Sequence, residues 1–411
     1  MERRQNEKKV EIKKIVMLFS MSFLPYQGRY LRVYNEAKTL VEAGKEVTVI
    51  AWDRDCRSPK KEVIDNIKIE RIWSRAGFQS GPLGIFRFLA FYLRLFPRLI
   101  RSQYDVIHCF NLDTIFPGLL IARIRGKKAI LDLCEPNYYS NWPRKYILLA
   151  KILQFFERIL SKRFDYLLLH SYYQVRKFQS YGVGALEHIG SYPNHSLIID
   201  KIKGQIDTDG AVVIGRIGSI YKDNGIEEMI DVFKRLKAAF TNVKLLIAGK
   251  VFDEFRDELN RLIFPLGDAI EVIGEFSPED LIGLYGKLDI SFQLSRRTDW
   301  FKDITPTKFF ESLASGVPVI TSDIGDLREI VKQYNCGVIV DETDPESIFL
   351  GLKRLVEDPG LRLKIAENGL RAVRDSFNWD LMGQRLLGVY RLLNSSGVLN
   401  NSAPLPEARE C

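Results

Sequence analysis

The sequence of 411 residues lacks the short motifs that identify several large enzyme classes. It has no GxGxxG, GxxxxGK(S/T), GxSxG or HExxH segment, so a dinucleotide-binding dehydrogenase, a P-loop nucleotidase, an α/β-hydrolase and a zinc protease lose their main sequence support. The five cysteines are scattered, odd in number and contain no CxxC pair. This cysteine usage predicts no structural zinc site and favours a reducing cytoplasm.

Strong charge asymmetry and long apolar runs are also absent. The formal net charge of +8 is a modest excess that suits anionic substrates, phosphates or a membrane surface, and it does not indicate nucleic acid as a partner. No stretch approaches the ~20 consecutive apolar residues of a membrane-spanning helix. The basic start and the apolar run 15–24 fit a buried first strand better than a signal peptide, because a helix and a second strand follow at once.

Apolar residues make up 46% of the chain and alternate between strand-like and helix-like patterns. A strand over 15–19, an amphipathic helix over 30–44 and a strand over 46–51 form a βαβ unit, and the alternation continues to about residue 194. A polar segment over 200–210 precedes a second series of the same kind. Nearly continuous apolar strands separated by helices predict an α/β protein with two doubly wound parallel sheets.

The most informative loop of the second half runs from Arg296 to Lys308 and leads directly into a helix that contains Glu311. Loops after strands hold the ligands of open α/β sheets, and the start of a helix offers backbone N–H groups to an anion. Thr307 is placed to cap this helix, Lys308 to meet a phosphate and Glu311 to accept hydrogen bonds from sugar or ribose hydroxyls. The alternative is a capped helix on which Lys308 and Glu311 form a solvated ion pair.

Residues 303–320 resemble the donor-site motif of retaining GT-B glycosyltransferases of the GT4 group. In that motif an acidic residue, here Asp303, precedes a glutamate, here Glu311, by eight positions, and the helix ends in a small residue followed by Gly-x-Pro-Val. The resemblance covers most of residues 12–380. Further segments similar to the family are 218–227, 246–250, 272–276, 32–38 and 105–108.

The resemblance implies a GT-B fold, in which two Rossmann-like domains face each other across a cleft. Residues 1–198 are expected to form the acceptor-side domain, 205–375 the domain that binds the sugar nucleotide, and 376–398 a helix that returns to the first domain. The implied activity is transfer of a sugar, with retention of configuration, from a nucleotide sugar to a lipid-linked or polysaccharide acceptor. No essential metal or other cofactor is expected, and the expected location is the cytoplasm or the inner face of the membrane.

The resemblance also assigns roles to individual residues. The catalytic candidates are Asp303, Lys308, Glu311 and His108. The donor-binding candidates are Gly218, Ser219, Lys222, Asn224, Gly249, Gly274, Thr305, Thr307, Lys308 and Glu311. Cys134 and Glu135 are the candidates on the acceptor side.

Three positions depart from the pattern of the family. Asp303 stands where a glutamate is usual, and Ser219 and Asn224 stand where relatives present an arginine and a lysine to the donor diphosphate. Cys134 replaces a histidine that faces the transferred sugar, and a thiol cannot act as a cationic donor. These departures keep two alternatives open, namely a GT-B protein that binds a sugar nucleotide or a partner transferase without turnover, and a nucleotide-sugar epimerase on the same fold.

The segment 84–101 combines four arginines with many aromatic and aliphatic residues. On a helix Arg87, Arg94, Arg98 and Arg101 fall within about 60° of one another. A narrow basic stripe of this kind, flanked by Phe88, Phe91, Tyr92 and Phe96, predicts binding to anionic headgroups at a membrane surface. The alternative is a core helix with one solvated basic face, and residues 142–163 form a weaker candidate of the same type.

Overall fold

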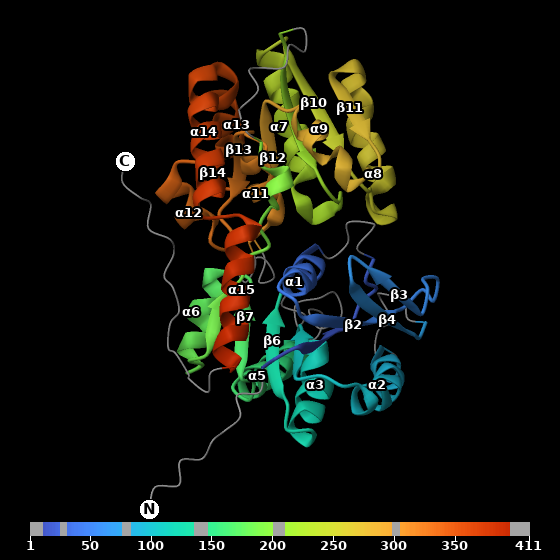
Figure 1. Cartoon of the computed structure of the whole chain (residues 1–411). Helices are drawn as coiled ribbons and strands as arrows, with labels where there is room; N and C mark the ends of the chain where they lie inside the picture. The colour runs from blue at the N-terminus through green and yellow to red at the C-terminus, as the bar shows by residue number, and fades with distance from the viewer. Residues whose placement is uncertain are drawn as a thin grey trace, which may run out of the picture. The chain divides into compact units, whose positions relative to one another are not determined.

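The computed structural model describes residues 11–24, 31–75, 84–134, 147–199, 210–297 and 305–394. The chain divides into two compact units, each built on one twisted sheet with helices packed against it (Figure 1). Unit 1 comprises Met1–Gly190 and Met382–Leu405, and unit 2 comprises Ser191–Leu381 and Pro406–Cys411. The predicted α/β fold with two Rossmann-like parallel sheets is therefore confirmed.

Unit 1 contains an eight-stranded sheet in the order β3-β4-β2-β1-β5-β6-β7-β8. Its strands are β1 (Lys14–Phe19), β2 (Glu46–Asp53), β3 (Lys61–Ile64), β4 (Ile67–Trp73), β5 (Val106–Phe110), β6 (Lys128–Leu133), β7 (Tyr166–Leu169) and β8 (Leu186–His188). Its helices are α1 (Leu31–Glu42), α2 (Gly84–Arg101), α3 (Leu112–Ile124), α5 (Ile147–Ser161), α6 (Tyr172–Ser180) and, from Met382 onward, α15 (Trp379–Asn394). Only β3 runs antiparallel to its described neighbour, since Asp65 and Asn66 turn the chain back with positive φ angles of 47° and 62°.

Unit 2 contains a six-stranded, all-parallel sheet in the order β11-β10-β9-β12-β13-β14. Its strands are β9 (Val212–Ile217), β10 (Val243–Ala248), β11 (Ile270–Ile273), β12 (Ile290–Gln293), β13 (Val319–Ser322) and β14 (Val338–Val340). Its helices are α7 (Ile226–Ala239), α8 (Asp253–Ile263), α9 (Leu281–Tyr285), α11 (Thr307–Ala314), α12 (Leu327–Tyr334), α13 (Pro345–Glu357) and α14 (Pro359–Asp375). Short 3-10 turns are η4 (His195–Leu197), η5 (Lys222–Asn224), η6 (Phe264–Ala269) and η7 (Pro278–Asp280).

Burial explains why these sequences form central strands. Every residue of β5, β9, β12 and β13 is buried, as expected for strands covered by helices on both faces, and the polar Ser291 of β12 and Thr321 of β13 are hydrogen-bonded. In each sheet the strand order reverses next to the first strand of the unit, between β1 and β5 and between β9 and β12. Loops at the carboxyl ends of strands on either side of such a reversal lie apart and leave a crevice where ligands bind in this class of fold.

The helix α2 differs from its predicted arrangement. Phe91 is buried and stacks on Trp52, with ring centroids 4.8 Å apart, and Phe88, Tyr92 and Phe96 also pack against the core of unit 1. The prediction that these aromatic side chains flank the arginines at a surface was therefore wrong for Phe91, which covers the sheet, while Phe88, Tyr92 and Phe96 are half-buried. Within the described part of the chain no helix has the length and apolar character needed to cross a membrane.

We expect Gly118→Ala to destabilise unit 1, because a Cβ at this position of α3 would lie 2.1 Å from the Cys109 Sγ of β5. The helix must then move off the sheet, at a cost of about 1–3 kcal/mol in the free energy of unfolding. Chemical denaturation followed by circular dichroism measures this loss.

The double variant Gly118→Ala/Cys109→Ala is the matching control, because it removes the sulfur atom that the new methyl group would meet. It should be more stable than the sum of the two single changes predicts. If the loss of stability in the double variant equals the sum of the losses in the two single variants, the contact between α3 and β5 is not the cause of the loss in Gly118→Ala.

Candidate functional site

Three glycines end neighbouring strands at the carboxyl edge of the unit 2 sheet. Gly218 follows β9, Gly249 follows β10 and Gly274 follows β11. Gly218 and Gly249 have φ angles of +129° and +139°, and a Cβ on Gly249 would lie 1.9 Å from the carbonyl oxygen of Gly218. The two loops thus touch backbone to backbone, and only glycine fits at the contact.

The helix α11, which follows β12 on the other side of the strand reversal, brings Lys308 to the same place. A Cβ on Gly218 would lie 2.8 Å from Lys308 Cε, so the lysine side chain passes directly over this glycine. Lys308 Nζ donates hydrogen bonds to both carboxylate oxygens of Glu311, at 3.0 and 3.2 Å. A positive charge and the start of a helix therefore meet the glycine loop at the reversal point, where the fold class binds its ligands.

The Glu311 carboxylate lies behind Lys308 and is only 4% exposed. Tyr285 of α9 donates a hydrogen bond from its hydroxyl to Glu311 Oε2 at 3.3 Å. Burial, and next the charge of Glu311, raise the pKa of Tyr285 well above its usual range, so the phenol stays a hydrogen-bond donor. The ion pair of Lys308 and Glu311 is consequently not the solvated surface pair of the alternative hypothesis.

Two threonines flank the start of α11 in different roles. The prediction that Thr307 caps the helix was wrong, because Pro306 occupies the capping position and Thr307 is the first helical residue. Thr305 donates its hydroxyl to Asp326 Oδ2 at 3.3 Å and so connects this loop to the one after β13. The predicted site residue Asp303 lies outside the described residues.

The loop 218–225 contains the positions that depart from the family pattern. Asn224 is buried and donates from Nδ2 to the Ser219 carbonyl oxygen at 2.7 Å, which fixes the shape of the loop. Lys222 is exposed and lies 3.6 Å from Glu227 and 3.5 Å from Glu258. Lys222, the exposed basic residue of this loop, therefore already has two carboxylates as partners.

Arg216, the other basic residue that the sequence suggests near this loop, points into unit 2. It is buried and donates from Nη1 to the Leu294 carbonyl oxygen at 2.9 Å. Burial lowers its pKa to about 10. The arginine thus connects β9 to the end of β12 below the glycine loop, and Lys308 remains the basic side chain that lies on the loop.

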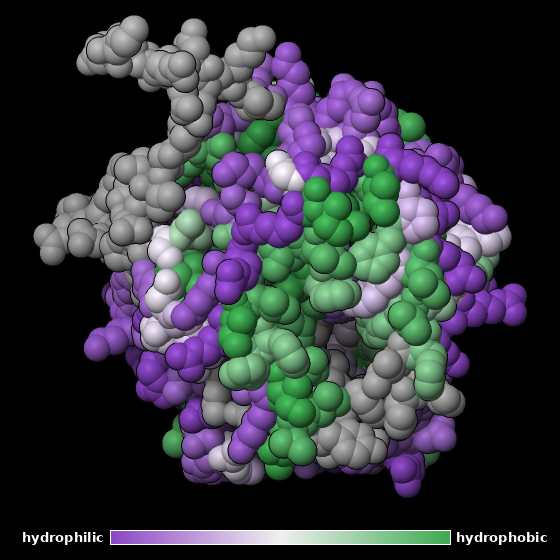
Figure 2. Space-filling view, turned by 90° about the horizontal axis from the view of Figure 1, so that it is seen from below, coloured by the Kyte–Doolittle hydropathy of each residue, from purple (hydrophilic) through white to green (hydrophobic). Residues whose placement is uncertain are grey.

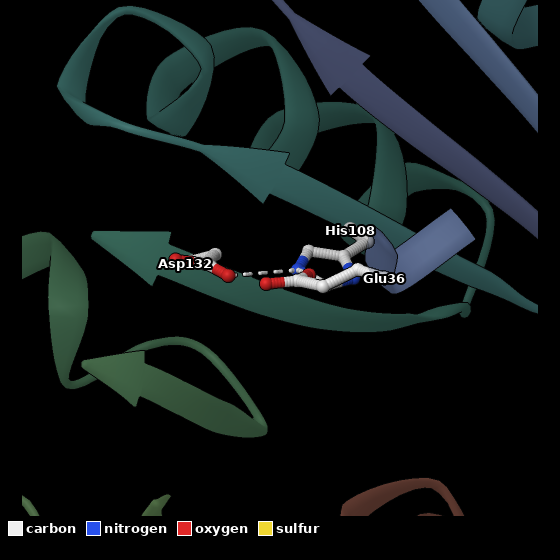
Figure 3. Close-up of side chains that lie close together, drawn as sticks. All are labelled: Glu36, His108 and Asp132. Atoms are coloured by element: carbon white, nitrogen blue, oxygen red, sulfur yellow. Dashed lines mark ion pairs between the residues drawn. The ribbon is translucent and has the colours of Figure 1, made fainter. Parts of the chain in front are cut away.

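In unit 1 a second set of ionisable side chains is fully buried. Glu36 of α1, His108 of β5 and Asp132 of β6 point toward one another (Figure 3). His108 Nε2 lies 3.5 Å from Glu36 Oε2 and 3.7 Å from Asp132 Oδ2, and its Nδ1 lies 3.0 Å from the hydroxyl of Tyr390 in α15. His108 thus joins the sheet to the C-terminal helix and lies entirely below the surface.

The potential ligand atoms of these three residues lie within 4.8 Å of one another, a spacing that suits a metal ion. Arg32, however, already contacts both carboxyl groups, with Nη2 at 2.8 Å from Asp132 Oδ1 and Nε at 3.0 Å from Glu36 Oε1. A metal cation would have to approach the buried guanidinium closely and be repelled by it. Arg32 is therefore the cation that this set of residues is built to hold.

Burial and the neighbouring charges shift the pKa values of the ionisable groups in this network in different directions. Burial, and next the charge of Asp132, raise the pKa of Glu36 well above its usual range, whereas burial lowers the pKa of His108. For Asp132, burial acts against ionisation, but the Arg32 charge and hydrogen bonds from His108 and Glu36 outweigh it and lower the pKa. Burial thus favours the neutral forms of Glu36 and His108, while Arg32 and Asp132 form an ion pair 2.8 Å apart.

The acceptor-side candidate Cys134 is tied to the same network. Its backbone N–H donates to Asn111 Oδ1 at 2.9 Å, and its Sγ lies 3.2 Å from Asp132 Oδ1. Burial raises the pKa of the thiol well above its usual range, so the side chain remains a neutral donor. The neighbouring candidate Glu135 lies outside the described residues.

The sequence reasoning missed three residues that shape these sites. Arg32 was noticed only as part of a family-like segment, and its buried partners lie far away in the sequence. Tyr285 sits in a short apolar helix that gives no sign of a polar role. Asp326 lies just after β13, and the rule that ligands sit beyond the carboxyl ends of strands points to it.

Two family models match this chain. The model of the glycosyl transferases group 1 matches residues 199–372, and that of glycosyltransferase family 4 matches residues 31–190. The capsular polysaccharide biosynthesis glycosyltransferase CapM of Staphylococcus aureus is 30% identical over 179 residues, which cover 43% of this chain and 45% of that protein. A GDP-mannose-dependent monoacylated alpha-(1-6)-phosphatidylinositol monomannoside mannosyltransferase of Corynebacterium glutamicum is 26% identical over 184 residues, covering 44% and 48%. The matched stretch thus spans a little under half of these curated relatives.

Solved structures resemble the whole chain more completely than these relatives do. The sucrose-phosphate synthase of Thermosynechococcus elongatus superposes with a TM-score of 0.76 at 17% identity, over 94% of this chain and 100% of that one. HepE of Anabaena, in complex with UDP and glucose, has a TM-score of 0.68 at 17% identity, over 92% and 100%. At these identities the likeness establishes the GT-B fold.

We expect Glu36→Gln to stabilise the protein progressively, relative to the wild type, as the pH rises from about 5. A carboxyl group with a raised folded pKa contributes stability that is fully present below its unfolded pKa and is lost as the pH rises toward the folded value. Glutamine keeps a neutral hydrogen-bonding group at this place without that loss, so the difference in unfolding free energy should grow by up to about 1.4 kcal/mol per pH unit.

Chemical denaturation of both proteins at several pH values measures this difference. Glu42→Gln is the matched control, because Glu42 lies on the same helix α1 in an exposed pair with Lys38. Its difference from the wild type should stay flat over the same range. A Glu36→Gln difference that is equally flat would show that Glu36 is ionised in the folded protein.

Proposed function

We propose that this chain, a GT-B protein of the glycosyl transferases group 1 and glycosyltransferase family 4, transfers a sugar from a nucleotide-sugar donor to a lipid-linked or polysaccharide acceptor. The observation that carries the proposal is the position of Lys308 over Gly218 at the strand reversal of unit 2. A diphosphate needs a close backbone approach, a cation and the N–H groups of a helix start, and these three features meet there. The acceptor classes are those of two similar proteins, CapM, which takes part in capsular polysaccharide biosynthesis, and the Corynebacterium phosphatidylinositol monomannoside mannosyltransferase.

In the proposed reaction the bond between the anomeric carbon and the diphosphate oxygen breaks, and its electron pair leaves with the diphosphate. The acceptor hydroxyl attacks the same face of the sugar while the leaving group is still close, which retains the configuration. The proton of that hydroxyl passes to the departing diphosphate oxygen. Lys308 and the amides at the start of α11 stabilise the charge that develops on the diphosphate, so no metal ion is required.

Glu311 is the proposed partner of the donor hydroxyls. Its carboxyl group is held by Lys308 and Tyr285 in one orientation. Holding the donor by its hydroxyls directs the anomeric carbon toward the acceptor, and positioning of this kind supplies much of the rate of such a reaction. Lys222 can assist with the phosphates once it leaves Glu227 and Glu258.

The second candidate function is a GT-B protein that binds a sugar nucleotide without turnover. The observation that favours it is the loop 218–225, where Asn224 fixes the backbone and Lys222 has carboxylate partners, so fewer cations face the diphosphate than relatives present. Incubation with radiolabelled sugar nucleotides and a lipid extract separates the two functions. Only the transferase moves label into an acceptor, and an epimerase would change the free sugar nucleotide instead.

We expect Glu311→Gln to lower kcat/KM for transfer at least about tenfold, because a charge-assisted hydrogen bond to a donor hydroxyl contributes ~1.5 to 3 kcal/mol. The melting temperature without donor should fall only modestly, because the amide keeps the shape of the side chain and its oxygen can still accept from Lys308 or Tyr285, although the ion pair is lost. The measurement is kcat/KM beside the unliganded melting temperature for both proteins.

Glu357→Gln is the control, because it removes the same charge from an exposed pair with Lys353 on α13. Its transfer rate and its melting temperature should both match the wild type. A purely structural Glu311 would give the reverse of the expected pattern, with lower stability and unchanged transfer per folded molecule.

We also expect residues 205–375, in unit 2, to carry the contacts to the base, ribose and diphosphate of the donor. Hydrogen exchange in the presence of UDP-glucose or GDP-mannose should slow near Gly218, Gly249, Gly274 and residues 305–311, because backbone N–H groups at these places would contact the base, ribose and diphosphate. A thermal shift first selects the better of the two donors, since a ligand at about 100 times its Kd adds about 2.7 kcal/mol of stability. Slower exchange confined to unit 1 would contradict the assignment.

A further inference from the structure

Three helices of unit 1 expose an unusual amount of apolar surface. α2 packs against α3, and α3 packs against α5, so the three lie next to one another on the sheet. More than half of the large apolar side chains that are exposed in the described part of the chain belong to them. These side chains, called the three-helix surface below, are Phe86, Leu89, Leu93 and Ile100 of α2, Phe116, Leu120 and Ile124 of α3, and Ile147, Leu148, Ile152, Phe155, Phe156 and Ile159 of α5.

The periodicity of α2 shows that this exposure is systematic. At 100° per residue, the buried Phe91, Leu95 and Leu99 define the side of the helix that faces the core. The exposed residues Phe86, Leu89, Leu93, Pro97 and Ile100 fall within about 80° of one another on the opposite side. The helix therefore has two apolar sides, one that covers the sheet and one that faces outward.

The four arginines lie between these two sides. Arg94 and Arg101 are exposed, and Arg87 and Arg98 are half-buried, on an arc directly beside the outward apolar side. The stem of an arginine can lie along apolar surface while the guanidinium stays in a polar layer. An apolar stripe with a parallel row of arginines is the arrangement that places a helix at the boundary between headgroups and acyl chains.

The charge of the other two helices has the same sign. Arg123 of α3 and Lys151 and Arg158 of α5 are exposed. The acidic residues of the three helices are Asp113, which accepts a hydrogen bond from Ser20, and Glu157, which is buried 3.6 Å from Lys177. The surface is thus apolar with a positive surround, the complement of an anionic membrane.

The side of unit 1 where α2, α3 and α5 lie shows this distribution directly. In the view from below, hydrophobic residues form a continuous area across the centre, with hydrophilic residues around it (Figure 2). Apolar areas of this extent are rare on proteins that remain free in water and mark sites of association.

We propose that the three-helix surface docks on an anionic lipid bilayer, with its apolar side chains at the level of the acyl chains and its arginines and lysines among the headgroups. Charge complementarity selects the bilayer over a second copy of this chain, because two copies would bring two positive surfaces together. This inference adds a membrane as a partner to the proposed function. It rests on that function in one respect, because a lipid-linked acceptor would lie in the same membrane.

The test is cosedimentation of the full chain with vesicles of phosphatidylcholine, with and without phosphatidylglycerol, at low and high salt. The wild type should bind the vesicles that contain phosphatidylglycerol, and binding should weaken as salt rises. Arg94→Gln/Arg101→Gln should weaken binding to these vesicles at low salt. Absence of binding at low salt, or equal binding to both kinds of vesicle, would overturn the proposal.

The apolar part is tested by Leu93→Glu/Phe155→Glu, which should reduce the partition coefficient at least about tenfold, since it puts two anionic groups against anionic headgroups. The two side chains are 65% and 59% exposed, so their replacement should leave the melting temperature unchanged. The matched control is Phe264→Glu/Leu363→Glu, at sites of unit 2 that are 87% and 50% exposed, and it should bind as the wild type does.

Light scattering without lipid separates a bilayer from a second copy. If the wild type is a dimer that Leu93→Glu/Phe155→Glu converts to a monomer while vesicle binding stays intact, the surface joins two copies and the proposal is wrong. Failure of the proposed function gives a different result. Binding to vesicles without transfer of label would support the docking surface and contradict the proposed transferase activity. Transfer of label without binding to vesicles would support the activity and contradict the docking surface.

Discussion

The reversal of strand order in each parallel sheet is the constraint on which the candidate site depends. In unit 2 the strands β10 and β11 lie on one side of β9, and the next strand in sequence, β12, lies on the other side. The loops after β9 and β12 consequently lead away in opposite directions from adjacent strands. Because Gly218 lies in one of these loops and α11 begins in the other, residues ninety positions apart are brought together, as the packing of Lys308 over Gly218 shows.

In unit 1 the buried network around Arg32 also brings together residues that lie far apart in the sequence. A buried ion pair contributes little net stability unless its remaining hydrogen-bonding groups are satisfied, because removing the charges from water is costly. Here the guanidinium also donates to the Ile189 carbonyl oxygen and His108 Nδ1 pairs with the Tyr390 hydroxyl, whereas both Glu36 oxygens and His108 Nε2 are buried without a hydrogen bond of good geometry. The network thus ties α1, two central strands and the C-terminal helix to one arrangement, which a purely apolar contact would specify less strictly.

The sequence predicted the two sheets well because buried parallel strands have nearly continuous apolar sequences. It did not reveal β3, a strand of only four residues, Lys61–Ile64, at the sheet edge, where exposed and half-buried side chains alternate but polar and apolar ones do not. It also misjudged α2, since periodicity identifies a polar arc but cannot say which of two apolar arcs faces the core. The role of Thr307 was misjudged for a similar reason, because the cap position depends on the residue at which the helix begins, and that is the least certain feature of a predicted helix.

The ion pair of Lys308 and Glu311 is compatible both with a structural role in α11 and with the proposed binding of a nucleotide sugar. An ammonium group has three donors, and Glu311 takes up two of them with its two oxygens. One donor is therefore left for a phosphate oxygen without breaking the pair, and the neutral Tyr285 still holds Oε2 when a diphosphate approaches. Glu311 keeps Lys308 over the glycine loop, and in the proposed function Lys308 meets the diphosphate while Glu311 meets the donor hydroxyls. In the proposed reaction a pair held in this way need not rearrange, and such preorganised charge is the main source of electrostatic stabilisation in enzymes.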